Sequence, residues 1–256
     1  MNDINNRLIS YANKYETAAF LQSDPSLFMH KVEGKANQET LAFIASCLSY
    51  GSRKQFFPKI QLILDCSGNN TFEWIANGNF RKDIPDDDEK CFYRLYTFHT
   101  IRILLEALQE LINRYGSLES FISQHADTGF AAVKAICNYF ADKGIEGVIP
   151  KNTSSACKRV CMFLRWMVRD NSPVDLGLWK KHIDKRTLIM PLDTHVIQES
   201  CKLGLLSSKT ASMSAAIKLT QRMLEIFPDD PLKGDFALFG YGVDESKWIR
   251  NRNQEY

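Results

Sequence analysis

Apolar residues recur every three or four positions along most of the chain, which is the spacing that places them on one face of an α-helix. Residues 37–50 are strongly apolar, and Gly51 ends them as a glycine commonly ends a helix. The same period predicts further helices at residues 4–22, 53–66, 72–76, 90–115, 117–124, 128–142, 154–169, 193–203, 208–226 and 230–240. No segment alternates apolar and polar residues as a half-buried strand does, so the pattern predicts an all-α fold.

The predicted helices are joined by loops and not by a long linker. Residues 78–88 and 144–153 contain the glycines and prolines of loops, and residues 170–193 are irregular. We therefore assign residues 1–256 to one compact unit. Within it we expect two helical lobes with a cleft between them, residues 36–193 as one and residues 1–35 with 194–256 as the other.

Composition narrows the class of protein. The 256 residues are 45% hydrophobic, which is enough for a substantial core, and the net charge of +2 gives no overall basic field. The seven cysteines lie mostly in apolar helical segments and include no Cys-x-x-Cys pair, so we expect reduced thiols in a cytoplasmic protein, with no metal and no cofactor. No apolar run approaches the roughly 18 residues of a membrane helix, so we expect no membrane partner.

Lys158 is the first candidate for chemistry, because it lies near the start of the helical segment that follows Ser154. The positive end of a helix and apolar neighbours such as Cys161 and Met162 both favour a neutral amine. A neutral lysine amine is a nucleophile that can attack the anomeric carbon of a nucleoside. The alternative is an exposed lysine that binds a phosphate, and its helix position alone favours that alternative.

Asp193 is the second candidate, because it directly precedes the next helical pattern and follows Pro191 by two residues. Aspartate is a common helix N-cap, and capping alone is enough to explain its presence there. A capping carboxylate that also faces a cleft can stabilise a sugar cation or accept a proton from a nucleophile. Lys158 and Asp193 together therefore indicate an enzyme that cleaves a C–N bond.

The segment around Asp193, residues 191–196 (PLDTHV), resembles the aspartate motif of the helix–hairpin–helix superfamily of DNA glycosylases. Bifunctional members of that superfamily carry a lysine at the start of the helix after the hairpin, where Lys158 lies. Residues 157–169, 172–177 and 203–206 resemble an uncharacterised bacterial family of glycosylase-like proteins, and the lysine-to-aspartate spacing is similar to that of archaeal 8-oxoguanine glycosylases. The resemblance extends to residues 48–51 (LSYG) and 236–240 (FALFG).

This resemblance implies a two-lobed helix–hairpin–helix fold with a central cleft, and an enzyme of base-excision repair. Lys158 would attack the anomeric carbon of an oxidised purine nucleotide such as 8-oxoguanine, and Asp193 would assist that attack. The resulting Schiff base would undergo β-elimination, which is the abasic-site lyase reaction. The implied partner is double-stranded DNA with a damaged base, bound by a monomer that is associated with the bacterial nucleoid while working.

The stretch that matches the hairpin, residues 149–155 (IPKNTSS), lacks the glycines of the usual motif. Free N–H groups at a helix start near Ser154, together with basic residues, can still hold a phosphate. The residues that we expect to contact DNA phosphates are Lys151, Ser154, Arg159, His195 and Arg53.

A glycosylase also stacks the extruded base against flat side chains. Tyr93, Tyr96 and Phe98 belong to an aromatic cluster in the predicted helix 90–115, and Trp166 lies about two helical turns after Lys158. We assign these four aromatic residues to the base pocket, although the alternative that they are core residues applies to each.

Three alternatives remain open from the sequence. The first is a glycosylase relative that has lost its activity and only binds DNA, or that acts on another base. The second is a helical DNA- or protein-binding module without chemistry. The third is a metal-dependent hydrolase that uses His99, His125, His182 or His195, for which no His-x-x-x-His pair gives support.

Overall fold

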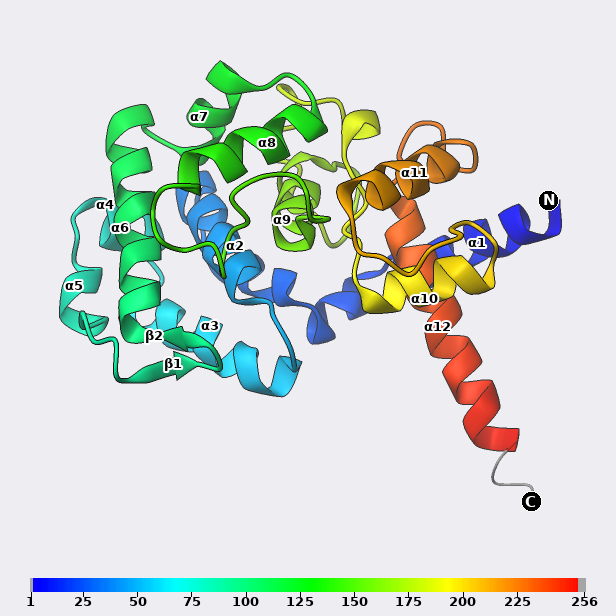
Figure 1. Cartoon of the computed structure of the whole chain (residues 1–256), viewed down its shortest axis with the longest axis horizontal. Helices are drawn as coiled ribbons and strands as arrows, with labels where there is room; N and C mark the ends of the chain where they lie inside the picture. Colours follow the sequence, from blue (N-terminus) through cyan, green and yellow to red (C-terminus); the bar gives the residue numbers. More distant parts are fainter. Residues whose placement is uncertain (1, 253–256) are drawn as a thin grey trace.

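The computed structural model describes the backbone of residues 2–252 and the side chains of residues 3–244, and these residues are predominantly helical (Figure 1). The elements are α1 (Asn2–Tyr15), the 3₁₀ helices η1 (Ala18–Ser23) and η2 (Pro25–Lys31), α2 (Lys35–Leu48), α3 (Arg53–Cys66), α4 (Thr71–Ala76), α5 (Phe80–Asp83), β1 (Cys91–Tyr93), β2 (Tyr96–Thr97), α6 (Phe98–Tyr115), α7 (Leu118–His125), α8 (Gly129–Phe140), α9 (Lys158–Val168), the 3₁₀ helix η3 (Lys185–Thr187), α10 (Thr194–Lys202), α11 (Met213–Leu224) and α12 (Lys233–Arg252). The prediction of a helical fold is confirmed at this level.

The terminal segments of the chain lie side by side. α1 packs along α12, and α10 also contacts α12, whereas α2 contacts α3, α4 and α9 (Figure 1). This arrangement groups helices from the two ends of the sequence, but the division into two lobes with a central cleft stays a prediction. No helix within residues 2–252 combines the length and the apolar character that crossing a membrane requires.

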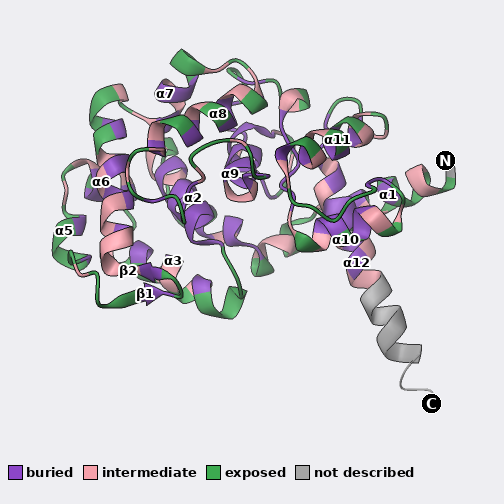
Figure 2. Ribbon diagram, viewed as in Figure 1, coloured by how far each residue is buried: buried purple, intermediate pink, exposed green. Residues whose placement is uncertain are grey.

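Two helices, α2 and α9, form the buried centre of the structure, and Figure 2 shows buried residues along both. In α2 every residue from 39 to 48 is buried, and in α9 every residue from 160 to 168. The rings of Phe43 and Phe163 meet edge to face between the two helices, with centroids 5.2 Å apart. Close packing on all sides therefore fixes α9, and with it the residue that begins this helix.

The prediction of one helix over residues 90–115 is wrong at its N-terminal end. Residues 91–97 form the antiparallel hairpin of β1 and β2, and α6 begins only at Phe98. The Thr97 side chain caps α6 by accepting a hydrogen bond from the Thr100 N–H group at 3.1 Å. Aromatic residues and threonine also favour strands, so their spacing in this segment fitted a helix only by coincidence. The predicted helix over residues 4–22 is likewise divided, into α1 and η1.

Glu39 is a buried carboxylate that joins α2 to two other parts of the chain. It accepts hydrogen bonds from the Leu118 N–H group at 2.9 Å, the Glu119 N–H group at 3.1 Å and the Trp179 indole N–H group at 2.8 Å. Burial raises the pKa of Glu39 to about 7, although the three donors each lower it. The folded protein therefore holds the Glu39 proton more tightly than the unfolded chain does.

We expect this carboxylate to make stability depend on pH. A raised folded-state pKa gives stability that is complete below the unfolded value of 4.5 and is lost as the pH rises through about 7. Between about pH 5 and about pH 8, Glu39 should lower the free energy of unfolding by about 2 to 3 kcal/mol. The variant Glu39→Gln has no such titration, so chemical denaturation at both pH values should give a flatter profile for the variant. Parallel profiles of the two proteins would contradict this assignment.

Candidate active site

Lys158 is the first residue of α9, and the residue before it has an unusual backbone. Cys157 adopts the left-handed conformation, with φ of 45° and ψ of 38°. The preceding segment turns, and Ser155 pairs with Ser212 as an isolated β-bridge. The left-handed residue breaks the helical path, so the prediction that the helix starts near Ser154 is wrong. The Ser154 N–H group is not free either, because it donates to Asn152 Oδ1 at 2.9 Å.

Asp193 is the N-cap of α10, as its position before the helical pattern predicted. Its Oδ1 atom accepts a hydrogen bond from the Val196 N–H group at 2.9 Å. Its other oxygen, Oδ2, lies 3.6 Å from Lys158 Nζ. The Lys158 side chain is 34% exposed and the Asp193 side chain 40%, so the pair is accessible to a ligand. One carboxylate oxygen is thus held by the helix while the second faces the amine.

Lys158 and Asp193 line two adjoining hollows of about 260 Å³ and about 580 Å³. Both hollows also include Ser49, Gly51 and His195. The smaller hollow is bounded by apolar side chains of five helices, Phe20, Phe56, Met162, Val196 and Phe239. The larger hollow is bounded by Cys157 and Leu192, which directly precede the two reactive residues in the sequence. Tyr50, Pro150 and Ala211 also line it. The amine and the carboxylate therefore share one concave region with an apolar part.

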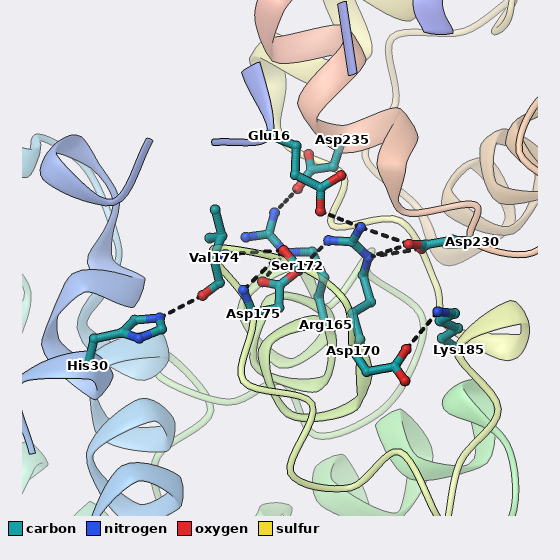
Figure 3. A network of polar contacts seen from close by, with 11 residues as sticks. Glu16, His30, Arg165, Asp170, Ser172, Val174, Asp175, Lys185, Asp230 and Asp235 are labelled. Atoms are coloured by element: carbon teal, nitrogen blue, oxygen red, sulfur yellow. Dashed lines mark hydrogen bonds and ion pairs between the residues drawn. The ribbon is translucent and has the colours of Figure 1, made fainter. Parts of the chain in front are cut away.

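A buried ionic network lies beneath the smaller hollow (Figure 3). Arg165 of α9 donates to Asp175 Oδ1 at 3.2 Å and to Asp235 of α12. Arg169, one residue beyond α9, donates to Asp175, to both oxygens of Asp230 at 2.8–3.1 Å and to Glu16 at 2.7 Å. Both arginines are buried, so removing a partner would leave an uncompensated charge in the core. The network thereby fixes α9 relative to the start of α12.

Asp235 connects this network to the two reactive groups, because it lines the smaller hollow with them. Burial raises the pKa of Asp235, and the charge of Asp193 raises it further, whereas Arg165 and Lys158 lower it. Asp235 therefore lies within electrostatic reach of both Lys158 and Asp193. It is a second carboxylate at this site that the sequence did not single out.

Comparison with known families adds one finding. Residues 24–244 match the model of the family described as "Protein of unknown function (DUF2400)". The chain belongs to this family. No curated protein and no solved structure matches the chain. All the groups of the site described above lie within the matched residues, apart from Phe20 at the edge of the smaller hollow and Glu16 in the ionic network.

The four aromatic residues assigned to the base pocket line neither of the two hollows in this DUF2400 protein. Trp166 is fully buried, as are all residues of α9 from 160 to 168. Eight helical positions also do not return a side chain to the same face of the helix, so Trp166 does not share the direction of Lys158. The hydroxyl groups of Tyr93 and Tyr96 donate to the carbonyl oxygens of Tyr50 and Gly147, so both rings brace the hairpin. The Phe98 ring packs edge to face on Phe92 within the same part of the fold.

The five residues predicted to contact phosphates lie in different settings. Arg53 and His195 line the smaller hollow, and Arg53 is exposed whereas His195 is half-buried. Arg159 uses its guanidinium group within the protein, since it donates to the Cys47 and Gly147 carbonyl oxygens at 3.0 and 2.9 Å. Lys151 is exposed but pairs with Glu146 at 2.6 Å, and Ser154 is exposed in the turn before Cys157.

Tyr50 is a residue of the site that the sequence reasoning missed. Its side chain is 41% exposed at the edge of the larger hollow, and the guanidinium carbon of Arg94 lies 4.9 Å from the centre of its ring. Leu95, at the tip of the hairpin, is 80% exposed and shares a third hollow with Tyr50. A tyrosine directly before Gly51, in the short segment that follows α2, was the available signal for this position.

The histidines are dispersed over the structure. His99 contacts Asp86, His182 lies 3.2 Å from Glu119 and His195 lies 3.9 Å from Glu199. Among the described side chains, no three histidine, cysteine, aspartate or glutamate residues come together as a set of metal ligands. The histidines named for the hydrolase alternative therefore do not form a shared site within residues 3–244.

Proposed function

We propose that this protein is a bifunctional DNA glycosylase and abasic-site lyase that acts on an oxidised purine such as 8-oxoguanine. The observation that carries the proposal is the 3.6 Å separation of Lys158 Nζ and Asp193 Oδ2 in a shared concave region. An amine and a carboxylate so placed can act as nucleophile and charge-stabilising group for one sugar. The resemblance of residues 191–196 to the glycosylase aspartate motif supports the same reaction.

The proposed reaction begins with the neutral amine of Lys158. Nζ attacks the C1′ atom of the damaged nucleotide while the bond between C1′ and the base nitrogen breaks, and the base leaves with the bonding electron pair. The ionised Asp193 carboxylate stabilises the positive charge that develops on the sugar, and Oδ2 then accepts a proton from the positively charged nitrogen that is now bonded to C1′. Opening of the sugar ring gives a Schiff base on Lys158, and β-elimination then breaks the strand on the 3′ side.

The surroundings of the site favour a nucleic-acid substrate despite the near-neutral chain. Arg53, Lys54 and Arg94 are exposed around Gly51, and none has a carboxylate partner among the described residues. Unpaired cations beside a concave site attract phosphate groups. Leu95 adds an exposed apolar side chain next to these cations, which suits contact with the bases of an opened duplex.

The proposal is tested by borohydride trapping with a panel of duplexes that each carry one lesion. We expect a covalent protein–DNA adduct with at least one oxidised purine and none with undamaged DNA, because only a Schiff base is reduced to a stable bond. The adduct should form equally well in the presence of a strong chelator. Loss with the chelator that zinc restores would point to the metal-dependent alternative.

A second candidate is a glycosylase-like protein that binds DNA without chemistry. It is favoured by one observation, the hairpin segment of residues 149–155, which lacks glycines and whose Ser154 N–H group is already hydrogen-bonded. Tight binding to lesion-containing duplexes with no trapped adduct on any lesion would establish this candidate and overturn the enzymatic proposal.

A further inference from the structure

Two cysteine sulfur atoms meet beside the candidate active site. Cys137 belongs to α8, and Cys157 is the residue that immediately precedes Lys158 at the start of α9. Their Sγ atoms lie 3.8 Å apart, and both cysteines are free. The two thiols are thus in van der Waals contact across the boundary between two helices, and no other residue separates them.

Cys157 differs from the other buried cysteines in its surroundings. It has a left-handed backbone and lines the larger hollow together with Lys158, so a small molecule in the hollow can reach it. Its Sγ atom lies 3.4 Å from the Ser155 carbonyl oxygen and 3.7 Å from the Ser155 hydroxyl oxygen. Cys47 and Cys161 lie inside helices, line neither hollow, and burial raises the pKa of each thiol.

The electrostatic setting separates the two partners. Donation of the Cys137 S–H group to Cys157 Sγ lowers the pKa of Cys157, although burial opposes this effect. The same hydrogen bond raises the pKa of Cys137, and burial adds to the rise. Cys157 is therefore the partner that reacts as a thiolate, and Cys137 stays a thiol that can react second.

We propose that Cys157 and Cys137 form a modification site for hydroperoxides. The Cys157 thiolate attacks one peroxide oxygen, the O–O bond breaks, and the leaving oxygen departs as an alcohol, or as water from hydrogen peroxide. The sulfenic acid left on Cys157 is attacked by the Cys137 sulfur, which forms the S–S bond and releases water with the Cys137 proton. Two thiols are oxidised and one peroxide is reduced, so the step needs no other reactant.

The modification takes place directly beside Lys158. A disulfide requires the sulfur atoms to approach from 3.8 Å to about 2 Å, and Cys157 is bonded directly to Lys158. The disulfide would join α8 covalently to the residue that precedes α9. This chemistry requires only the two thiols and an oxidant, and is independent of the reaction proposed for Lys158.

The test is peptide mapping of the full-length protein after treatment with hydrogen peroxide, followed by alkylation of the remaining thiols under denaturing conditions. We expect loss of alkylation at Cys157 and Cys137 and a linked peptide pair that is lighter by two hydrogen atoms than the separate peptides. Dithiothreitol should restore both thiols. Alkylation of Cys157 that persists under conditions that oxidise the exposed Cys91, or a linked pair with another cysteine, overturns the proposal.

Two variants complete the experiment. In Cys137→Ser the linked pair should disappear, while the serine hydroxyl keeps a hydrogen-bond donor beside Cys157, which should react with dimedone, a reagent for sulfenic acids. In Cys161→Ala, a matched change of a buried cysteine on α9, the linked pair should form as in the natural protein. Absence of dimedone labelling in Cys137→Ser would also contradict the order of reaction given above.

Discussion

Lys158→Gln is expected to abolish the covalent adduct that borohydride traps on lesion-containing DNA, with a fall in the rate of adduct formation of at least about 1,000-fold. Glutamine has a similar length but no nucleophilic amine, so neither attack on C1′ nor a Schiff base is possible. The fold should be unaffected, because the Lys158–Asp193 pair is part-exposed and such pairs contribute little to stability. Trapping with single-lesion duplexes measures the rate, and thermal unfolding checks the fold.

Two further variants separate the amine from its charge. Lys158→Arg keeps a cation beside Asp193 but removes the nucleophile, so it should be as inactive as Lys158→Gln while binding DNA like the natural protein. Lys218→Gln is the matched control, since Lys218 is an exposed lysine on α11 that lines neither hollow. It should form the adduct at nearly the natural rate. An adduct that persists in both Lys158 variants would show that another amine reacts.

The helical positions of Lys158 and Asp193 were largely predictable because each signal is local. An aspartate before a helical pattern is a cap, and the apolar period around Lys158 indicates a helix, although the sequence placed its start about four residues too early, near Ser154. Both residues do begin helices, and the resemblance to a glycosylase motif was what linked them across 35 positions in the sequence. Helical content was predictable for the same reason, since most helices present one apolar face to the core.

The floor and the edge of the site were not predictable, because they depend on packing between distant segments. Asp235 contacts Arg165, which lies 70 positions earlier in the sequence, and this contact holds it at the site. No local sequence feature distinguishes Asp235 from any other acidic residue in the first turn of a helix. Trp166 looked suitable for a base pocket by its type, but α9 is buried on all sides and its ring is part of the core. The left-handed Cys157 was also unforeseen, since only glycine, asparagine and aspartate commonly adopt that conformation.

Asp193→Asn is expected to slow adduct formation by about 100-fold to 10,000-fold. Asparagine caps helices as well as aspartate does, so the hydrogen bond from the Val196 N–H group is kept and the stability of α10 changes little. The charge that faces Lys158 is lost, however, and with it the acceptor for the amine proton. DNA binding should be unchanged or tighter, because a negative charge has been removed from the site.

Capping and chemistry are then separated by a pair of alanine variants. Asp193→Ala removes both the cap and the charge, whereas Thr128→Ala removes only a cap, the one that accepts from the Ala131 N–H group at the start of α8. Each should lower the free energy of unfolding by about 1 kcal/mol, but only Asp193→Ala should slow adduct formation. If the two variants lost stability and rate in the same proportion, Asp193 would be a helix cap without a part in catalysis. A slow Asp193→Asn protein with natural stability excludes that outcome, since nothing but the carboxylate charge differs.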